Sequence, residues 1–390
     1  MERIILKRKI APRIASGHPW IFNNEIEKID GSPSPGSIVE VFYYDGKFAG
    51  RGYFNQLSQI VVRLLTRNRK TEINEEFFFK KLEECWSYRK KIGYTENCRL
   101  VFGEADGLPQ LIIDKFNDYF VIQTLALGID LWKPAIVKAL ERLFNPKGVF
   151  ERNDVSVREL EGMTQQAGFL SDPFDTKIII NENGLKFKVD IENGQKTGYF
   201  LDQQDNRRAI QHIVKGADVL GVFTYTGTFE IHAAHYGAKN VLGLDISENA
   251  VVQANENAVL NKVNNICHFE VANAFDFLKL WGNEGRQYDV VMLDPPAFTK
   301  NRASLDKAIT GYKEINLRAM KLIKPGGFLV TSSCTNLVSP ELFLQTIEMA
   351  AKDARKKIRQ VVFNTQSPDH PIVWNIENTE YLKFLIVQIL

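Results

Sequence analysis

The first part of the chain shows the alternation of apolar and polar positions that is typical of short β-strands. Three such runs are present, over 38–44, 47–53 and 59–65. The dipeptide Asp45-Gly46 separates the first two runs. Asp-Gly between two alternating runs is a strong signal for a β-hairpin. A polar tract over 66–70 follows, so the pattern predicts a small β-barrel domain over 1–70.

The middle of the chain mixes the spacing of helices with that of strands. Apolar residues recur at helical spacing over 75–91 and Gly93 follows them, which predicts a helix that ends there. Further segments predict strands over 100–102, 111–114 and 119–125, a helix over 130–144, a strand near Val149, and a hairpin of 177–180 with 185–191 around Asn183-Gly184. We therefore expect a central α+β domain over 71–185.

Beyond about residue 203 the pattern changes to strands that alternate with helices. Seven strands are predicted, over 217–223, 240–245, 266–271, 288–293, 327–332, 361–364 and 384–390. Such alternation indicates a doubly wound α/β sheet. Ligands bind such sheets at the carboxyl ends of the strands, where the strand order reverses. We expect this domain to span 186–390.

Composition and charge exclude several classes of protein. The 390 residues are 44% hydrophobic and 25% charged, which is ordinary for a globular protein and excludes disorder as the main state. The net charge is only +2, but the segment 1–70 holds 12 Lys and Arg against 6 Asp and Glu. A basic module beside a nearly neutral body is typical of a protein that docks on phosphates. A merely soluble surface explains the same charge equally well.

The sequence also bears on cellular location and on metals. No run approaches the roughly 18 consecutive apolar residues of a membrane span, and Lys7, Arg8 and Lys9 stand where a signal peptide would be apolar. The four cysteines are widely spaced and form no C-x-x-C pair, so we expect neither a disulfide framework nor a metal site. Reduced thiols favour the cytoplasm, without a membrane partner.

Three strand ends of the last domain together describe an adenosine pocket. Gly227 allows a tight turn and a close approach of the backbone to a ligand. Asp245 follows about 20 residues later, where it suits a ribose hydroxyl pair, and the amide of Asn273 suits an adenine edge. The structural alternatives are a plain strand-to-helix turn at Gly227 and a helix N-cap at Asn273. Because no dinucleotide or phosphate-loop fingerprint is present, we expect a nucleoside cofactor without a pyrophosphate.

The next two strand ends carry the candidate chemistry. The fourth strand runs into Asp294-Pro295-Pro296, whose prolines fix the backbone after the carboxylate. The fifth strand ends at Cys334, beyond its apolar stretch and among hydroxyl residues. Neighbouring strands lie about 5 Å apart, so we expect Cys334 and Asp294 to face one cleft. The remaining cysteines, Cys85, Cys98 and Cys267, are interpreted as small buried hydrophobic residues.

The chain resembles a known family over nearly its whole length. The motifs that carry the resemblance occur in order along the chain: Gly17-His18-Pro19-Trp20-Ile21-Phe22, Gly50-Arg51-Gly52-Tyr53-Phe54-Asn55, Phe102-Gly103-Glu104-Ala105-Asp106-Gly107-Leu108-Pro109, Lys196-Thr197-Gly198-Tyr199-Phe200-Leu201-Asp202-Gln203, Tyr225-Thr226-Gly227, Asp294-Pro295-Pro296-Ala297-Phe298, Ser333-Cys334-Thr335 and Asp369-His370-Pro371. The family is that of the AdoMet-dependent ribosomal RNA large subunit 5-methylcytidine methyltransferases (RlmI-like). Gly221 departs from the pattern, where methyltransferases often carry an acidic or amide residue, and so does Thr228, where a second glycine is usual.

The resemblance implies an RNA-binding PUA β-barrel, a central α+β domain and a class I, Rossmann-like, seven-stranded methyltransferase domain. The cofactor would be S-adenosyl-L-methionine (AdoMet) and the partner large-subunit ribosomal RNA, while a homodimer stays open. The cofactor would be held by Tyr199, Asp202, Phe223, Tyr225, Thr226, Gly227, Asp245, Ile246, Asn273, Ala274, Asp294 and Pro295. Phosphate contacts are expected from Arg13, Arg51, Arg63 and Arg67.

The expected reaction is methylation of cytosine carbon 5. This carbon is a weak nucleophile, so Cys334 would first add to carbon 6 while Asp294 binds the nitrogen edge of the ring. The target base must leave its stack to reach the cleft. Rival interpretations are methylation of a ring or exocyclic nitrogen, with Cys334 as a bystander, and a non-catalytic RNA-binding assembly factor that has kept a cofactor fold. A nicotinamide dehydrogenase fits least well, since the glycine pattern is absent.

Overall fold

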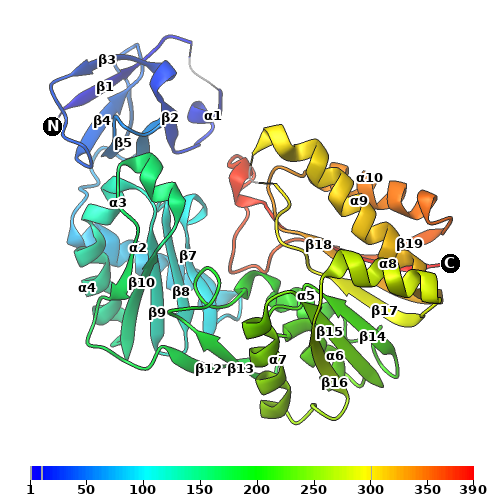
Figure 1. Cartoon of the computed structure of the whole chain (residues 1–390). Helices are drawn as coiled ribbons and strands as arrows, with labels where there is room; N and C mark the ends of the chain where they lie inside the picture. Colours follow the sequence, from blue (N-terminus) through cyan, green and yellow to red (C-terminus); the bar gives the residue numbers. More distant parts are fainter. Residues whose placement is uncertain (1, 10–11, 300) are drawn as a thin grey trace. The chain divides into compact units, whose positions relative to one another are not determined.

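The computed structural model describes residues 2–9, 12–299 and 301–390. It divides into two compact units, shown in Figure 1. Unit 1 comprises Met1–Ile180, Val189–Leu201 and Pro368–Thr379, and unit 2 comprises Asn181–Lys188, Asp202–Ser367 and Glu380–Leu390. Segments that are distant in the sequence therefore complete each unit.

The first sheet of unit 1 contains six strands in the order β2-β6-β5-β4-β1-β3. Its strands are β1 (Arg3–Leu6), β2 (Trp20–Phe22), β3 (Ile26–Asp30), β4 (Ile38–Phe42), β5 (Phe48–Phe54) and β6 (Ile60–Thr66), with α1 (Pro12–Ala15) and the short helix η1 (Asn23–Glu25) between them. The three predicted strands are confirmed as β4, β5 and β6, and β4 pairs antiparallel with β5 around Asp45-Gly46. Its core is a separate apolar cluster that includes Ile21, Val39 and Val62.

The second sheet of unit 1 contains five strands in the order β11-β10-β9-β8-β7. Its elements are α2 (Glu75–Lys91), β7 (Asn97–Phe102), η2 (Gly103–Asp106), β8 (Leu111–Phe116), β9 (Tyr119–Thr124), α3 (Leu127–Leu131), α4 (Lys133–Phe144), β10 (Gly148–Asn153), η3 (Ser156–Glu161) and β11 (Gln166–Phe169). Helix α2 contacts α4. The predicted helix over 75–91 is confirmed as α2. Asn74 caps its N-terminus, where its side chain accepts a hydrogen bond from the Phe77 amide.

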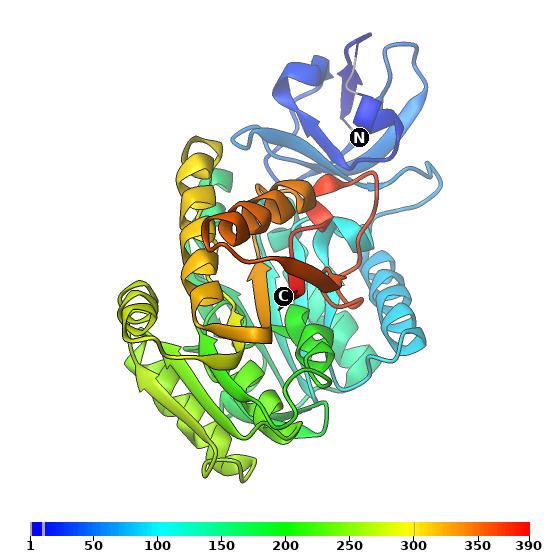
Figure 2. The same ribbon diagram turned by 90° about the vertical axis from the view of Figure 1, so that its right-hand side faces the viewer.

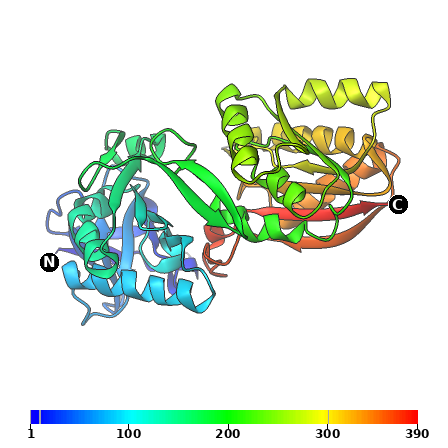
Figure 3. The ribbon, with the colours of Figure 1, turned by 90° about the horizontal axis from the view of Figure 1, so that it is seen from below.

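The strands β12 (Lys177–Glu182) and β13 (Leu185–Asp190) form the predicted hairpin. Figure 3 shows this hairpin as a green two-stranded ribbon. Asn183 and Gly184 at its turn both adopt positive φ angles, of 51° and 84°. These are the values that a tight hairpin turn requires and that Asn and Gly tolerate best.

Unit 2 contains the predicted seven-stranded sheet, in the order β16-β15-β14-β17-β18-β20-β19. Its strands are β14 (Asp218–Val222), β15 (Asn240–Asp245), β16 (Cys267–Val271), β17 (Tyr288–Leu293), β18 (Ile323–Ser333), β19 (Ile358–Asn364) and β20 (Lys383–Ile389). Strands β14 to β18 are parallel, whereas β20 runs antiparallel to both of its neighbours. A parallel return requires a long crossover, usually a helix, and the connection from β19 to β20 contains only the short η6 (Glu377–Thr379).

The helices of unit 2 connect these strands and cover the sheet. They are η4 (Leu201–Gln203), α5 (Gln204–Ala209), α6 (Thr228–His235), α7 (Glu248–Leu260), α8 (Ala274–Glu284), η5 (Arg302–Ser304), α9 (Leu305–Lys321) and α10 (Pro340–Asp353). Helix α9 contacts α8 and α10, and Figure 2 shows α9 beside α10, whereas α6 contacts α5 and α7. An apolar cluster of unit 2 joins α8, α9 and α10 to the central strands through Leu220, Tyr312 and Phe343. Within the described ranges, no helix is long and apolar enough to span a membrane.

Candidate active site

The candidate active site lies at the carboxyl ends of β14 to β18 in unit 2. The order of these strands reverses between β14 and β17, because β15 and β16 lie on one side of β14 and β17 and β18 on the other. Parallel strands bring their carboxyl ends to the same edge of the sheet, and ligands bind where the order reverses. The predicted residues from Phe223 to Cys334 follow these strand ends directly.

The loop that follows β14 is held in an unusual backbone conformation. Phe223, Tyr225 and Gly227 have φ angles of 63°, 47° and 78°. This left-handed region is costly for residues with a side chain, by about 1–3 kcal/mol each, and such strain gathers at ligand sites. A Cβ atom on Gly227 would lie only 2.4 Å from the ring of Phe269, so no other residue fits there. Gly227 is therefore more than an ordinary turn residue.

The carboxylate of Asp245 fastens this loop from the end of β15. Its Oδ2 accepts a hydrogen bond from the Tyr225 amide at 2.8 Å, and its Oδ1 accepts one from the Ser247 amide at 2.9 Å. Ser247 itself caps the N-terminus of α7. Each carboxylate oxygen keeps a second lone pair for a ribose hydroxyl. Ile246 follows with 73% of its surface exposed, as an apolar face for a base.

The residues at the ends of β16 are less distinctive. The Oδ1 of the exposed residue Asn273 accepts a hydrogen bond from the Phe275 amide, so this side chain is the N-cap of α8. The structural alternative for Asn273, a helix N-cap, is therefore confirmed. Its side-chain amide nitrogen remains as a donor for a ligand. Ala274 is buried in the first turn of the same helix.

Polar atoms of the loop itself fit a bound nucleoside. The hydroxyls of Thr224 and Thr226 are buried and have no hydrogen-bond partner in the described part of the chain. Buried polar groups are nearly always paired, so these atoms indicate a surface that a ligand or water completes. Asp202 is buried as well and accepts a hydrogen bond from the Tyr381 hydroxyl at 2.6 Å. Tyr199, which was expected on the same wall, is a buried residue of unit 1.

Asp294 stands directly after β17. The side-chain amide of Gln203 donates a hydrogen bond to its Oδ1 at 3.0 Å. Burial raises the pKa of the Asp294 carboxyl to about 6, helped by the negative charge of Asp202, while hydrogen bonds from Ser332 and Gln203 act in the opposite direction. A carboxyl with this pKa holds a proton in about one molecule in ten at pH 7, far more often than an ordinary aspartate, so both its proton-donating and its accepting form are present.

Cys334 lies one residue beyond β18, next to the Asp294 loop. Strand β18 pairs with β17 so that Thr331 is opposite Leu293, and the Cys334 thiol donates to the Pro295 carbonyl at an Sγ–O distance of 3.9 Å. The structure describes all four cysteines, and Cys334 alone is not buried. Burial raises the pKa of the other three thiols, which makes them poor nucleophiles.

Lys383 is a functional candidate that the sequence reasoning missed. It is opposite Ser333 in the antiparallel pair of β20 and β18, and only 1% of its surface is exposed. Its ammonium donates to the carbonyls of Thr335 and Tyr381. Burial lowers the pKa of Lys383 to about 8, and the neighbouring Cys334 and Glu380 act against this shift. A cation beside a thiol favours the thiolate. The sequence signal that could have revealed Lys383 is a lysine within the apolar run 382–390.

The four arginines expected to contact phosphate lie in unit 1. Arg51 and Arg63 are buried, and each forms an ion pair, with Glu40 at 2.8 Å and with Glu161 at 2.7 Å. Asn55 also donates to Glu161, so this carboxylate is the centre of a buried network. The Arg51–Glu40 pair joins β5 to β4 within the first sheet, whereas the Arg63–Glu161 pair joins β6 to η3, one of the elements of the second sheet. Neither guanidinium group faces solvent.

The other two arginines lie nearer the surface. Arg13 pairs with Glu25 at 2.6 Å and remains 27% exposed. Arg67 is exposed, although it donates to three backbone carbonyls, those of Ile14, His18 and Ala49. Of the four, Arg67 keeps the most surface for a phosphate.

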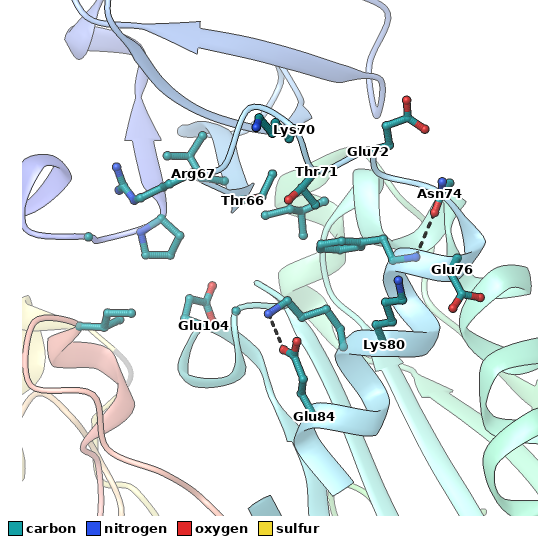
Figure 4. A pocket seen from close by; sticks show the side chains of 18 residues that line it. Thr66, Arg67, Lys70, Thr71, Glu72, Asn74, Glu76, Lys80, Glu84 and Glu104 are labelled. Atoms are coloured by element: carbon teal, nitrogen blue, oxygen red, sulfur yellow. Dashed lines mark hydrogen bonds and ion pairs between the residues drawn. The ribbon is translucent and has the colours of Figure 1, made fainter. Parts of the chain in front are cut away.

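Arg67 lines a cavity of about 780 Å³ in unit 1, between the first sheet and helix α2 (Figure 4). Lys70 and Lys80 also line it, and both are exposed and form no ion pair within the described residues. Acidic residues are present as well, among them Glu84, which pairs with Lys81. The lysines were missed because only the folded chain brings Lys70, which follows β6, and Lys80, on α2, to one cavity.

Comparison with known proteins identifies both domains and the family of the chain. A model described as "PUA-like domain" matches residues 4–67, and one described as "S-adenosylmethionine-dependent methyltransferase" matches residues 164–385. The chain is 38% identical to ribosomal RNA large subunit methyltransferase I of Shewanella frigidimarina, covering 99% of both chains. It is also 38% identical to the protein of that name from Tolumonas auensis, covering 95% of both. The chain belongs to this family.

Solved structures support the fold of this methyltransferase family. A structure from Streptococcus mutans, described as a SAM-dependent methyltransferase, matches with a TM-score of 0.83 at 20% identity and covers 100% of both chains. A methyltransferase complexed with SAH matches with a TM-score of 0.84 and the same coverage. The expected fold class is thereby confirmed, and AdoMet is the cofactor of the methyltransferase domain.

The buried pair of Arg63 and Glu161 yields a test of its structural role. We expect Arg63→Ala to lower the free energy of unfolding of unit 1 by about 3–5 kcal/mol, because it leaves a buried carboxylate without its cation. The matched control Lys70→Ala, at an exposed site, changes stability by about 0.5 kcal/mol or less. Urea denaturation followed by tryptophan fluorescence measures both. Wild-type stability of Arg63→Ala would show that this arginine has another purpose.

The location of Lys383 predicts the reactivity of the Cys334 thiol. We expect Lys383→Met to slow alkylation of Cys334 by iodoacetamide at pH 7 by about tenfold or more, because the thiolate loses a neighbouring cation. Lys383→Arg, which keeps the charge, serves as the control. Peptide mass spectrometry separates Cys334 from the buried cysteines, and an unchanged rate in Lys383→Met would refute the role.

Proposed function

We propose that the protein methylates carbon 5 of a cytidine in large-subunit ribosomal RNA, through a covalent adduct with Cys334. The observation that carries the proposal is the location of this thiol, which is the accessible one and is 3.9 Å from the carbonyl that follows Asp294. The names of the relatives support ribosomal RNA as the substrate. The carboxyl Asp294 and the cation Lys383 on either side of the thiol support a covalent mechanism.

Each side chain has a defined task in this reaction. The Cys334 thiolate forms a bond to carbon 6 of the cytosine, and the electron pair of the 5,6 double bond moves into the ring. Asp294 contributes a proton to the ring nitrogen, where the charge develops. When bound, AdoMet supplies the methyl group that the activated carbon 5 takes. A base then removes the carbon 5 proton, and the sulfur–carbon bond breaks to release Cys334.

The cofactor placement follows from the strand ends. We assign the ribose to Asp245, the base to the surface of Ile246, Asn273 and Ala274, and the remaining wall to the loop after β14 with Asp202 and Pro295. The left-handed backbone of this loop and its unpartnered hydroxyls, those of Thr224 and Thr226, support this placement. Tyr199, a residue of unit 1, stays an expectation from the family resemblance.

Unit 1 would dock the RNA. We assign the phosphate contacts to Arg67 and Arg13, together with Lys70 and Lys80 beside the cavity. Trp374 is 96% exposed and lies two residues from Ile376, which lines the same cavity. An exposed indole offers a stacking surface to an unpaired base. The domain boundaries at residues 70 and 185 remain part of this proposal.

A second candidate is methylation of a ring or exocyclic nitrogen. The contact of Gln203 with Asp294 favours it, because an amide and a carboxyl with a rigid proline exit can position an amine without any thiol. Cys334 would then be a bystander. The two candidates differ in the atom that is methylated and in the need for sulfur.

Cys334→Ala separates these candidates. We expect it to abolish formation of 5-methylcytidine in ribosomal RNA while the dissociation constant for AdoMet stays within about twofold, because the thiol acts after the cofactor is bound. The measurement combines nucleoside mass spectrometry with calorimetry, and Cys85→Ala is the control. RNA that carries 5-fluorocytidine should trap wild-type protein, but not Cys334→Ala, in a denaturant-stable adduct. Methylation that survives in Cys334→Ala would favour the nitrogen candidate.

The docking surface predicts the salt dependence of RNA binding. We expect Lys80→Ala to weaken binding of a ribosomal RNA fragment several-fold and to lower the slope of log K against log salt by about one, as expected for one lost phosphate contact. Lys147→Ala, an exposed lysine away from the cavity, should change neither quantity. Fluorescence anisotropy at several salt concentrations measures both, and equal slopes for Lys80→Ala and wild type would contradict the assignment.

A further inference from the structure

A glutamate of α6 occupies the space that a side chain at position 221 would need. Gly221 lies within β14, one residue before its end, and a Cβ atom built on it would be 1.9 Å from Oε1 of Glu230. No side chain at 221 is compatible with the present position of this carboxyl. The glycine therefore makes room for a carboxyl that enters from the neighbouring helix.

This carboxyl is buried and incompletely paired. Glu230 is 2% exposed, and its Oε2 has no hydrogen-bond partner in the described part of the chain. A buried carboxyl oxygen that lacks a partner destabilises the folded state, so the fold does not gain from it in the free protein. A group that pairs only with a ligand explains why such a residue is present.

The surroundings of Glu230 favour its neutral form in the free protein. Burial raises the pKa of Glu230 to about 8, and the charges of Asp294 and Asp245 add to this shift. Arg207 is the cation that acts against this rise of the Glu230 pKa. The thiol of Cys267 also lies near Glu230. A positive charge brought by a ligand would lower this pKa again.

The strand order indicates which end of the cofactor approaches Glu230. The adenosine part is assigned to β15 and β16, through Asp245 and Asn273. Strand β14 is the next in the sheet, and β17 with Asp294 follows. The methionyl part therefore extends over β14, where Glu230 lies against Gly221. This part carries the ammonium and sulfonium charges of AdoMet.

We propose that Glu230 supplies the carboxylate that receives the methionyl ammonium of AdoMet, from a helix position that is available because residue 221 is glycine. The inference rests on the cofactor placement proposed above. On binding, the carboxylic acid of Glu230 loses its proton to the solvent, and the resulting carboxylate accepts an N–H of the ammonium. Glu230 thus replaces the side chain that Gly221 lacks.

Calorimetry with AdoMet and with S-adenosylhomocysteine tests the inference. Both ligands carry the ammonium, so Glu230→Gln should weaken both by about 10- to 100-fold, which is the loss of one charge-assisted hydrogen bond. Titrations at pH 7 in buffers of different ionisation enthalpy should show that wild type releases more protons than Glu230→Gln. Glu284→Gln, at an exposed carboxylate of α8, is the matched control and should bind like wild type.

Exchange of the two positions gives a sharper test. Gly221→Asp alone should bind weakly, because two carboxyl groups compete for one space. Gly221→Asp combined with Glu230→Ala should bind AdoMet at least about tenfold more tightly than Glu230→Ala alone. Failure of the pair to recover affinity, while its melting temperature matches wild type, would overturn the inference.

Two further readouts separate this inference from the cofactor placement. Because the folded state raises the pKa of Glu230, the apo protein should lose stability as the pH rises from about 4.5 to 8. Glu230→Gln should lose less over the same range. If this difference appears but Glu230→Gln binds AdoMet like wild type, Glu230 is structural and the inference is wrong. If Asp245→Asn also binds like wild type, the proposed cofactor placement itself is wrong.

Discussion

The pairing of β17 with β18 is the constraint on which the candidate chemistry depends. Thr331 opposite Leu293 brings two strand ends together, and the residues that follow them are a thiol and a carboxyl. A shift of the register by one residue would turn every side chain of the strand to the other face. The pair β18–β20 then adds Lys383 from the last strand of the chain. Three chemically different groups meet because neighbouring strands share one edge.

The same end of the sheet, at the carboxyl ends of its parallel strands, carries features that do not stabilise the fold. Phe223 and Tyr225 adopt backbone angles that suit glycine, and Glu230 holds an unpaired oxygen in the interior. Each feature costs free energy, and the apolar cluster behind the sheet provides the stability that tolerates these costs. The strained backbone follows β14, whereas Asp294 and Cys334 follow β17 and β18. In the proposed placement of the cofactor, the topological reversal between β14 and β17 would separate cofactor binding from the chemical step.

Much of this arrangement follows from sequence because its signals are local. The helical spacing of 75–91 and the Asp-Gly turn depend on neighbouring residues, and the order of strand ends follows from the rules for doubly wound sheets. The interpretation of Gly227 and Asp245 relied on such rules, and the structure shows Asp245 bound to the Tyr225 amide in the loop that contains Gly227.

The remaining features depend on partners that are distant in the sequence. Arg63 was expected to contact phosphate, but it is buried and paired with Glu161, 98 positions away. Lys383 lies beside Cys334 because the last strand returns antiparallel without a crossover helix. The segment Pro368–Thr379 joins unit 1, although its flanks belong to unit 2. No periodicity or short motif encodes such long-range pairings.

Nucleoside mass spectrometry of large-subunit ribosomal RNA, from cells with and without this protein, tests the central claim most directly. The account predicts that one 5-methylcytidine disappears without the protein and that its location maps to a single cytidine. An unchanged level of 5-methylcytidine, or loss of a nitrogen-methylated base in its place, would contradict a mechanism that begins with attack by a thiol.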